Sequence, residues 1–350
     1  MRRAIFTTGV AAVTAVAAGC TSSSATSQAP NSVSSAHVVL RLGVLTNITH
    51  APALIGIAKG YFAKSLGKNV KLEVQPFSTG TEEGTALLAG QLDAAYVGPN
   101  PTIKAWQTSN GKLIKVISGA ASGGAALVVK PSFHNPAQLK GHRLATPSLG
   151  NTQDVTLRYW LRQHHLTATH TGGGEVPITP VTPNSAAVLQ FKSGRIAGGW
   201  EPAPYDIEMV RDGGHVLVDE ASLWPKGQFV TTNLVVTQRF IAAHPSVVRG
   251  LLKGQIQANN YIHASLLGAE AAANTELSQL TGRGLDPSVL SAAFKQITFT
   301  NDPIASSLTA DAQHAVAVGL LSPVRNISAL YDLGPLNTLL KASGQPQVSS

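Results

Sequence analysis

Residues 38–77, VVLRLGVLTNITHAPALIGIAKGYFAKSLGKNVKLEVQPF, contain the pattern that decides the fold. Segments 38–45 and 70–77 are apolar and rich in β-branched residues, which predicts two strands. Between them, residues 52–64 carry apolar side chains at helical spacing, which predicts a helix. A strand, a helix and a second strand at this spacing indicate an α/β fold.

The same alternation continues along the chain. We expect strands at 94–97, 113–117, 126–129, 144–146, 176–181, 196–200, 216–219 and 234–237, and helices at 82–90, 101–109, 151–164 and 184–192. This order favours mostly parallel sheets with helices on both faces.

Two similar strands, LVVK at 127–130 and LVVT at 234–237, enclose a long segment. We interpret them as paired crossovers between two lobes. Beyond residue 238 the pattern is almost entirely helical, at 245–263, 270–281, 287–296 and 310–321, so this part should pack on one lobe.

The first twenty residues, MRRAIFTTGVAAVTAVAAGC, have the features of an export signal. Arg2 and Arg3 precede an uncharged stretch at 4–18, which is too short to span a bilayer as a helix. Its ending resembles the bacterial lipobox, which implies lipidation of Cys20, although a plain secretory signal would also fit. Residues 21–37 are rich in Ser and Thr and have no Asp, Glu, Lys or Arg, so we expect a flexible tether.

Composition excludes several classes of protein. With 350 residues, 43% hydrophobic and 13% charged, the chain can form two domains with large cores. One Cys excludes intrachain disulfides and multi-cysteine metal sites. The formal charge is +8, but the basic residues are scattered, so no nucleic-acid-binding arm is indicated. Phosphate-loop, nucleophile-elbow and zinc-protease motifs are absent.

Four loops place small polar residues where a strand should end and a helix should begin, at 46–47, 78–81, 98–101 and 148–152. Free backbone N–H groups and hydroxyls at helix N-termini bind oxyanions. Each loop alone could simply cap its helix, through Thr81, Asn100 or Asn151. Four such loops together predict an anion site at the carboxyl ends of the strands.

Trp200 and Glu201 follow another predicted strand. The indole could pack against the apolar part of a ligand or belong to the core. Glu201 is unfavourable beside an anion unless it meets a ligand cation or points away.

Six segments together resemble the nitrate/sulfonate/taurine family of ABC-transporter substrate-binding proteins, most closely its aliphatic-sulfonate branch. They are THAPALIGIAKGYFAK (49–64), FSTGTEEGTALLAGQLDAAYVGPNP (77–101), ATPSLGNTQDVTLRYWL (145–161), LWPKGQFVTTNLVVT (223–237), TFTNDPIASSL (298–308) and ISALYDLGPLN (327–337). The resemblance implies a type II periplasmic-binding fold with lobe 1 at 38–129 plus 232–350, lobe 2 at 130–231, and a hinge near Val129 and Thr232.

The resemblance also implies cleft positions, including Ser122, Gly123, Thr231 and Thr232, which the loops had not indicated. Together with the loops it predicts this set of ligand-binding residues: Thr46, Asn47, Thr79, Gly80, Thr81, Gly98, Asn100, Ser122, Gly123, Gly150, Asn151, Thr152, Gln153, Trp200, Glu201, Thr231 and Thr232. One stretch departs from the family. Where relatives have Trp-x-Pro-Glu-Pro-Trp and a nearby arginine, this chain has Trp200-Glu201-Pro202-Ala203-Pro204-Tyr205 and then Glu208.

The resulting hypothesis is an exported, lipid-anchored, monomeric binding protein at the outer face of the cell membrane. It would deliver a small organic anion, an aliphatic sulfonate, to a permease and its ATPase, without cofactor, metal or nucleic acid. Nitrate, bicarbonate or a neutral heteroaromatic vitamin precursor are alternative ligands. The alternative class of protein is an enzyme with this fold. The related sulfinate desulfinase relies on a cysteine in the cleft, but no Cys follows position 20 in this chain. The related pyrimidine synthase is cytosolic, unlike a chain with an export signal.

Overall fold

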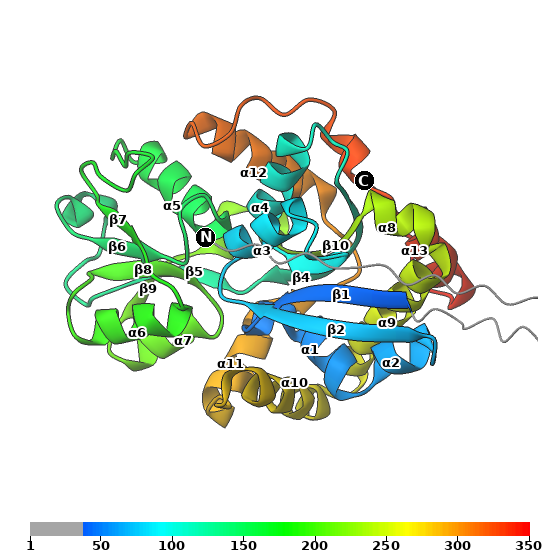
Figure 1. Cartoon of the computed structure of the whole chain (residues 1–350). Coiled ribbons are helices and arrows are strands. Elements are labelled where there is room, and N and C mark those ends of the chain that lie inside the picture. The colour runs from blue at the N-terminus through cyan, green and yellow to red at the C-terminus, as the bar shows by residue number, and fades with distance from the viewer. Residues whose placement is uncertain (1–37) are drawn as a thin grey trace, which may run out of the picture. The chain divides into compact units, whose positions relative to one another are not determined.

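Two mixed β-sheets, each with helices packed on both faces, make up the part of the chain that the computed structural model describes, residues 38–350 (Figure 1). The predicted export signal, Cys20 and the tether lie outside the described residues.

The six strands of the first sheet come from both ends of the described chain. β1 pairs in parallel with β2 and β3, whereas β10 pairs antiparallel with β3 and β4. In spatial order the strands are β11 (Ile297–Phe299), β4 (Ile114–Gly123), β10 (Val230–Thr237), β3 (Ala94–Val97), β1 (Val38–Leu45) and β2 (Val70–Phe77).

The second sheet is built from the middle of the chain. In spatial order its strands are β7 (Ile178–Pro180), β6 (Leu144–Thr146), β8 (Gly198–Pro202), β5 (Ala125–Val129) and β9 (His215–Asp219). β6 pairs in parallel with β7 and β8, and β5 pairs antiparallel with β8 and β9.

The expectation of mostly parallel sheets is therefore wrong in detail. β4 carries the chain out of the first sheet and β10 brings it back, so these neighbours run in opposite directions. β5 likewise enters the second sheet directly from β4, without a crossover helix, and is antiparallel to both its neighbours.

The crossover also lies earlier in the chain than the sequence indicated. The resemblance implies that residues 126–129 belong to the first lobe, but β5 pairs only within the second sheet. The chain passes between the sheets at Gly123 and Gly124, whose φ angles of 85° and 75° belong to the left-handed region. Glycine has no Cβ, so it adopts this region without strain.

The helices mostly match the predicted segments. The expected helix at 52–64 is two helices, because Gly60 adopts a φ of 65°. The helices are α1 (Ala51–Ala58), α2 (Tyr61–Leu66), α3 (Gly80–Leu88), α4 (Pro99–Thr108), α5 (Thr152–Gln163), α6 (Asn184–Lys192), α7 (Tyr205–Arg211), α8 (Gln238–Ala243), α9 (Pro245–Ala264), α10 (Leu266–Thr281), α11 (Pro287–Gln296), α12 (Ala305–Ala317) and α13 (Gly334–Ala342), with 3-10 turns at Ile48–His50, Pro136–Leu139, Glu220–Leu223, Pro225–Gly227 and Ile327–Leu330.

Alternating side chains of central strands build a core on each face of a sheet. In β10, Leu234 and Val236 pack with α9 and α13, whereas Val235 packs with α4 and α12 on the other face. In β5, Leu127 packs near α5, and Val128 faces α6 and α7. This is the two-residue period of a strand buried on both faces.

No helix among residues 38–350 combines the length and apolarity needed to cross a membrane. Within the same residues, no group of three or more His, Cys, Asp or Glu side chains is placed to hold a metal ion.

A buried carboxyl group connects the core of the second sheet to its covering helix. Glu220 accepts hydrogen bonds from Trp200 Nε1 at 2.7 Å and from Thr156 Oγ1 at 3.2 Å. Burial raises the pKa of Glu220 to about 7. A carboxyl whose pKa is higher folded than unfolded stabilises the fold at low pH, and this stabilisation is lost as pH rises through 7.

We predict that Glu220→Gln flattens the pH dependence of stability. The neutral amide does not titrate, so the melting temperature of the variant should fall less than that of the wild type between pH 5 and 8. Thermal unfolding followed by circular dichroism measures this. Glu73→Gln, on the partly exposed surface of β2, is the control and should keep the wild-type slope. An unchanged slope in Glu220→Gln would contradict the assignment.

Candidate functional site

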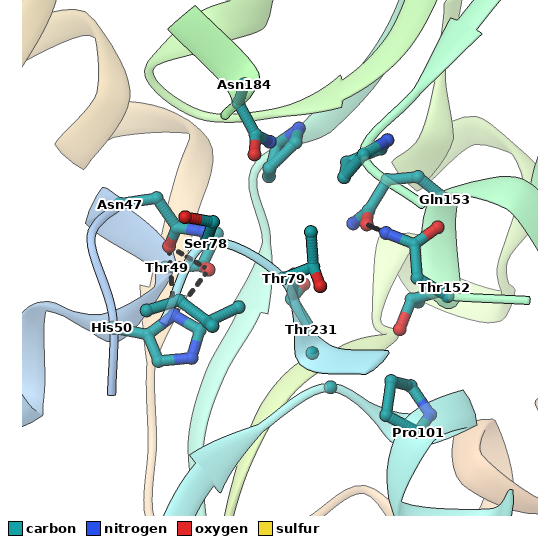
Figure 2. A pocket seen from close by; sticks show the side chains of 16 residues that line it. Asn47, Thr49, His50, Ser78, Thr79, Pro101, Thr152, Gln153, Asn184 and Thr231 are labelled. Carbon is teal, nitrogen blue, oxygen red and sulfur yellow. Dashed lines mark hydrogen bonds between the residues drawn. The ribbon is translucent and has the colours of Figure 1, made fainter. Parts of the chain in front are cut away.

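A small polar pocket lies between the two sheets and contains no Asp, Glu, Lys or Arg side chain in its lining. Its cavity volume is about 30 Å³, so the two halves must move apart before the pocket can admit a ligand larger than about two water molecules. The lining residues, most of which Figure 2 labels, are Leu45, Asn47, Thr49, His50, Ser78, Thr79, Gly80, Gly98, Pro101, Pro147, Asn151, Thr152, Gln153, Asn184, Pro202 and Thr231.

Helix N-termini from both sheets converge on this pocket. α3 begins at Gly80 and α5 at Thr152, and both residues line it. Gly98, which precedes α4, lines it as well, but Pro99 and Pro101 have no N–H, so α4 offers mainly its dipole there. The N-terminal ends of helices carry partial positive charge and free N–H groups. Such an arrangement can hold an anion without a formal cation in the pocket wall.

The side chain of Gln153 is held with its N–H₂ group free. Asn151 caps α5, because its Oδ1 accepts from the backbone N–H of Asp154 at 2.9 Å. Its Nδ2 must then donate, and it does so to Gln153 Oε1 at 2.9 Å. Gln153 consequently has Nε2 available as a donor toward the pocket.

His50 anchors the loop that carries Asn47. Its Nε2 lies 2.8 Å from the carbonyl oxygen of Tyr96, which can only accept, so Nε2 carries a hydrogen. Nδ1, which carries no hydrogen in the neutral ring, lies 2.9 Å from one end of the Asn47 side-chain amide, and Thr49 Oγ1 lies 2.7 Å from the same end (Figure 2). Burial lowers the pKa of His50 to about 4. The contacts therefore place one end of the Asn47 amide against His50 and Thr49.

Asn184 enters the pocket from the second sheet (Figure 2). Its Nδ2 donates to Glu201 Oε2 at 3.0 Å. Glu201 is fully buried, and this burial raises its pKa well above the usual range, with further upward influence from the nearby Asp206. A neutral carboxyl group can lie close to a bound anion without repelling it.

The pocket brings together eight of the predicted site residues, from both sheets. They are Asn47, Thr79, Gly80, Gly98, Asn151, Thr152, Gln153 and Thr231. The sequence did not single out Thr49, His50 or Asn184. Thr49 and His50 follow Asn47 in the same loop, and Asn184 begins a helix after a predicted strand, so the rule that found the other loops could have found them.

Four other predicted residues line neighbouring cavities. Thr46 and Tyr205 both line one of these cavities. The Tyr205 hydroxyl donates a hydrogen bond to the Thr46 carbonyl oxygen at 3.0 Å. Thr81, Asn100 and Gly150 border another, beside α4. Thr81 Oγ1 and Ser148 Oγ, 2.8 Å apart, connect the two halves of the molecule there.

Three further predicted residues belong to the crossover. The Ser122 hydroxyl accepts from the backbone N–H of Phe229 at 3.3 Å, and the Gly123 carbonyl accepts from the Thr231 hydroxyl at 2.6 Å. Thr232 is fully buried in β10.

Trp200 and Glu201 do not line the pocket. We expected their strand to end at residue 200, but β8 continues to Pro202, so both side chains project from opposite faces of the sheet. Trp200 packs in the core next to Trp160, while Glu201 lies on the side of Asn184. Pro202, the last residue of the strand, reaches the pocket instead.

Two α/β lobes, each a sheet with helices on both faces, are joined by crossovers and have a polar pocket between them. This arrangement defines the periplasmic-binding-protein fold. The structure is similar to that of an alkanesulfonate-binding protein SsuA from Xanthomonas axonopodis pv. citri bound to MOPS, with a TM-score of 0.67, 18% identity and coverage of 82% of this chain and 95% of that one. It is also similar to the periplasmic nitrate-binding protein NrtA from Synechocystis PCC 6803, with a TM-score of 0.69, 15% identity and coverage of 87% and 89%.

The chain belongs to the NMT1-like family, whose profile matches residues 35–279. Among curated proteins it is similar to the taurine-binding periplasmic protein of Escherichia coli (strain K12), with 27% identity over 210 residues. This match covers 59% of the chain and 62% of that protein, so the two align over less than two thirds of either length.

The two halves of the pocket meet most closely at Gly98. A Cβ added to Gly98 would lie 2.6 Å from Thr152 Oγ1, which belongs to the other half. Real Cβ atoms do not approach this closely, so a side chain at position 98 would push Thr152 and the N-terminus of α5 outward.

We predict that Gly98→Ala weakens ligand binding by about 1–3 kcal/mol, the usual cost of overpacking. Titration calorimetry with the ligand that the screen below identifies measures it. Gly84→Ala is the matched control, because a Cβ at this helical position would meet its nearest neighbour at an ordinary 3.6 Å. Equal affinities for the two variants would show that the contact at Gly98 is unimportant.

Proposed function

We propose that this chain is the solute-binding component of an ABC importer, without catalytic activity of its own. It captures a small organic anion, an aliphatic sulfonate, between its two sheets and delivers it to a permease with an ATPase partner. The observation that carries the proposal is the convergence of the N-termini of α3, α4 and α5 on one small pocket whose wall has no Asp, Glu, Lys or Arg side chain.

The available interactions are sufficient in magnitude. A helix N-terminus contributes about 0.3–1 kcal/mol to anion binding, and up to about 2 kcal/mol when partly buried. A hydrogen bond to a charged group contributes about 1.5–3 kcal/mol. Two or three of each approach the roughly 8 kcal/mol of a micromolar complex, so no arginine is required.

Proteins similar to this chain are named for oxyanion ligands, which supports an oxyanion here. The particular oxyanion differs from one similar protein to another. The similar proteins include taurine-binding, alkanesulfonate-binding and nitrate-binding proteins. All these anions carry oxygens that helix N-termini can bind. We favour a sulfonate, while nitrate, bicarbonate and a neutral heteroaromatic vitamin precursor are the alternatives that a ligand screen separates.

Release would require the two halves to separate. We propose a hinge at the chain crossings, near Gly123 and Gly124 on the outward path and near Val230 on the return. Opening would break cross-cleft contacts such as the hydrogen bond from Tyr205 to Thr46. Few residues would need to change conformation, as in other hinge closures.

We predict that alkanesulfonates raise the melting temperature of the purified protein, through preferential binding to the folded state. Gln153→Leu should weaken this response, because it removes a free donor at the N-terminus of α5. Gln163→Leu, an exposed position at the other end of the same helix, should keep the wild-type response. A response to neutral heteroaromatic compounds, with none to anions, would refute the sulfonate proposal.

We also propose that the protein is held at the outer face of the cell membrane through a lipid on Cys20. The wild-type protein should fractionate with membranes, and Cys20→Ser should be released into the soluble fraction, because the variant lacks the thiol to which the lipid is attached. Immunoblots of fractionated cells measure this. Continued membrane association of the variant would contradict the anchor.

A further inference from the structure

The amide group of Asn184 differs from the N–H groups that surround the pocket. The N-termini of α3 and α5 and Gln153 Nε2 supply donors. Asn184 instead uses its donor end on Glu201, at 3.0 Å. Its Oδ1 has no hydrogen-bond partner among the described residues, and the side chain lines the pocket. The free end of Asn184 is therefore an acceptor.

Glu201 holds this orientation while its Oε2 carries no hydrogen. If the Asn184 amide were reversed, its Oδ1 would face Glu201 Oε2, and two acceptors would lie 3.0 Å apart. The same holds for a neutral Glu201 whose proton is on Oε1, an atom without a hydrogen-bond partner within residues 38–350, whereas a proton on Oε2 would let the carboxyl group donate to a reversed amide. Glu201 itself cannot turn away freely, because its side chain is fully buried beside Asp206.

An acceptor is unfavourable against a simple oxyanion. All the peripheral atoms of nitrate, and the entire head group of an alkanesulfonate, accept hydrogen bonds. Beside such a ligand, Asn184 Oδ1 would lose its hydration without gaining a partner, which is costly. A ligand with an amine or hydroxyl group close to its anionic head would satisfy Oδ1 and the pocket donors at once.

We propose that Asn184, oriented by Glu201, is a specificity-determining residue that selects oxyanions carrying a hydrogen-bond donor over matched oxyanions without one. The inference rests on the proposed function and narrows its ligand class. Glu201 acts as a positioning residue, since it does not line the pocket. The donor can belong to an aminosulfonate or to a small hydroxylated anion such as bicarbonate, because both offer the same chemistry to Oδ1.

Titration calorimetry with two ligand pairs tests the inference. Taurine and propane-1-sulfonate have equal numbers of heavy atoms and the same sulfonate head, and only taurine carries an ammonium group. Bicarbonate and nitrate are planar monoanions, and only bicarbonate carries a hydroxyl. The wild type should bind the donor-bearing member of at least one pair about 10-fold or more tightly than its partner, the effect of one hydrogen bond involving a charged group. The pair that shows the preference identifies whether the donor of the natural ligand is an ammonium group or a hydroxyl group.

Variants then assign the preference to residues. Asn184→Leu should bring the affinity ratio close to one. Glu201→Leu should reduce the ratio, because it removes the acceptor for Asn184 Nδ2 and leaves either end of the amide free to face the pocket. Gln190→Leu, farther along α6 and outside the pocket lining, is the control and should keep the wild-type ratio. A fold defect lowers both affinities of a pair together, so the ratio separates selectivity from stability.

Three outcomes would overturn the inference. Equal binding within both pairs by the wild type would refute the selectivity and leave the proposed function intact. An unchanged ratio in Asn184→Leu would show that another residue causes the preference. Failure of all four anions to bind would refute the inference together with the proposed function.

Discussion

The meeting of helix N-termini from two separate sheets is the interaction on which the rest of the site depends. α3 and α4 belong to the first sheet and α5 to the second, so the pocket exists only when the two halves are close. Gly98 allows that approach, because no side chain separates it from Thr152. The charge that would attract an anion is thus distributed over backbone dipoles rather than carried by one lysine or arginine.

Such a pocket constrains the acids around it. Glu201 and Glu220 are both buried in the second half, and burial raises the pKa of each, which favours their neutral forms near an anion. Each has a structural partner, Asn184 for Glu201 and Trp200 for Glu220. Charged carboxylates would disfavour a bound anion. In their neutral forms, Glu201 and Glu220 act as hydrogen-bond partners that hold the side chains of Asn184 and Trp200.

Much of this organisation could be predicted from the sequence, because local patterns encode it. Strands 38–45, 70–77, 94–97 and 144–146 were placed correctly, and the loops before α3 and α5 were found from their small polar residues. The antiparallel course of β5 and β10 depends on pairing between distant segments, which no local pattern reveals. The sequence places Trp200 and Glu201 in the cleft because the predicted strand ends at residue 200. β8 continues to Pro202, so these two side chains project from the faces of the sheet instead. The capture of Asn184 by Glu201 joins residues 17 positions apart and is visible only in three dimensions.

A crystal structure of the protein with propane-1-sulfonate or taurine, whichever binds more tightly, tests the central claim most directly. The sulfonate oxygens should lie within hydrogen-bond distance of backbone N–H groups at the start of α3 and α5 and of Gln153 Nε2. A sulfonate bound to a lysine or arginine side chain outside this pocket, with the helix N-termini unliganded, would contradict it.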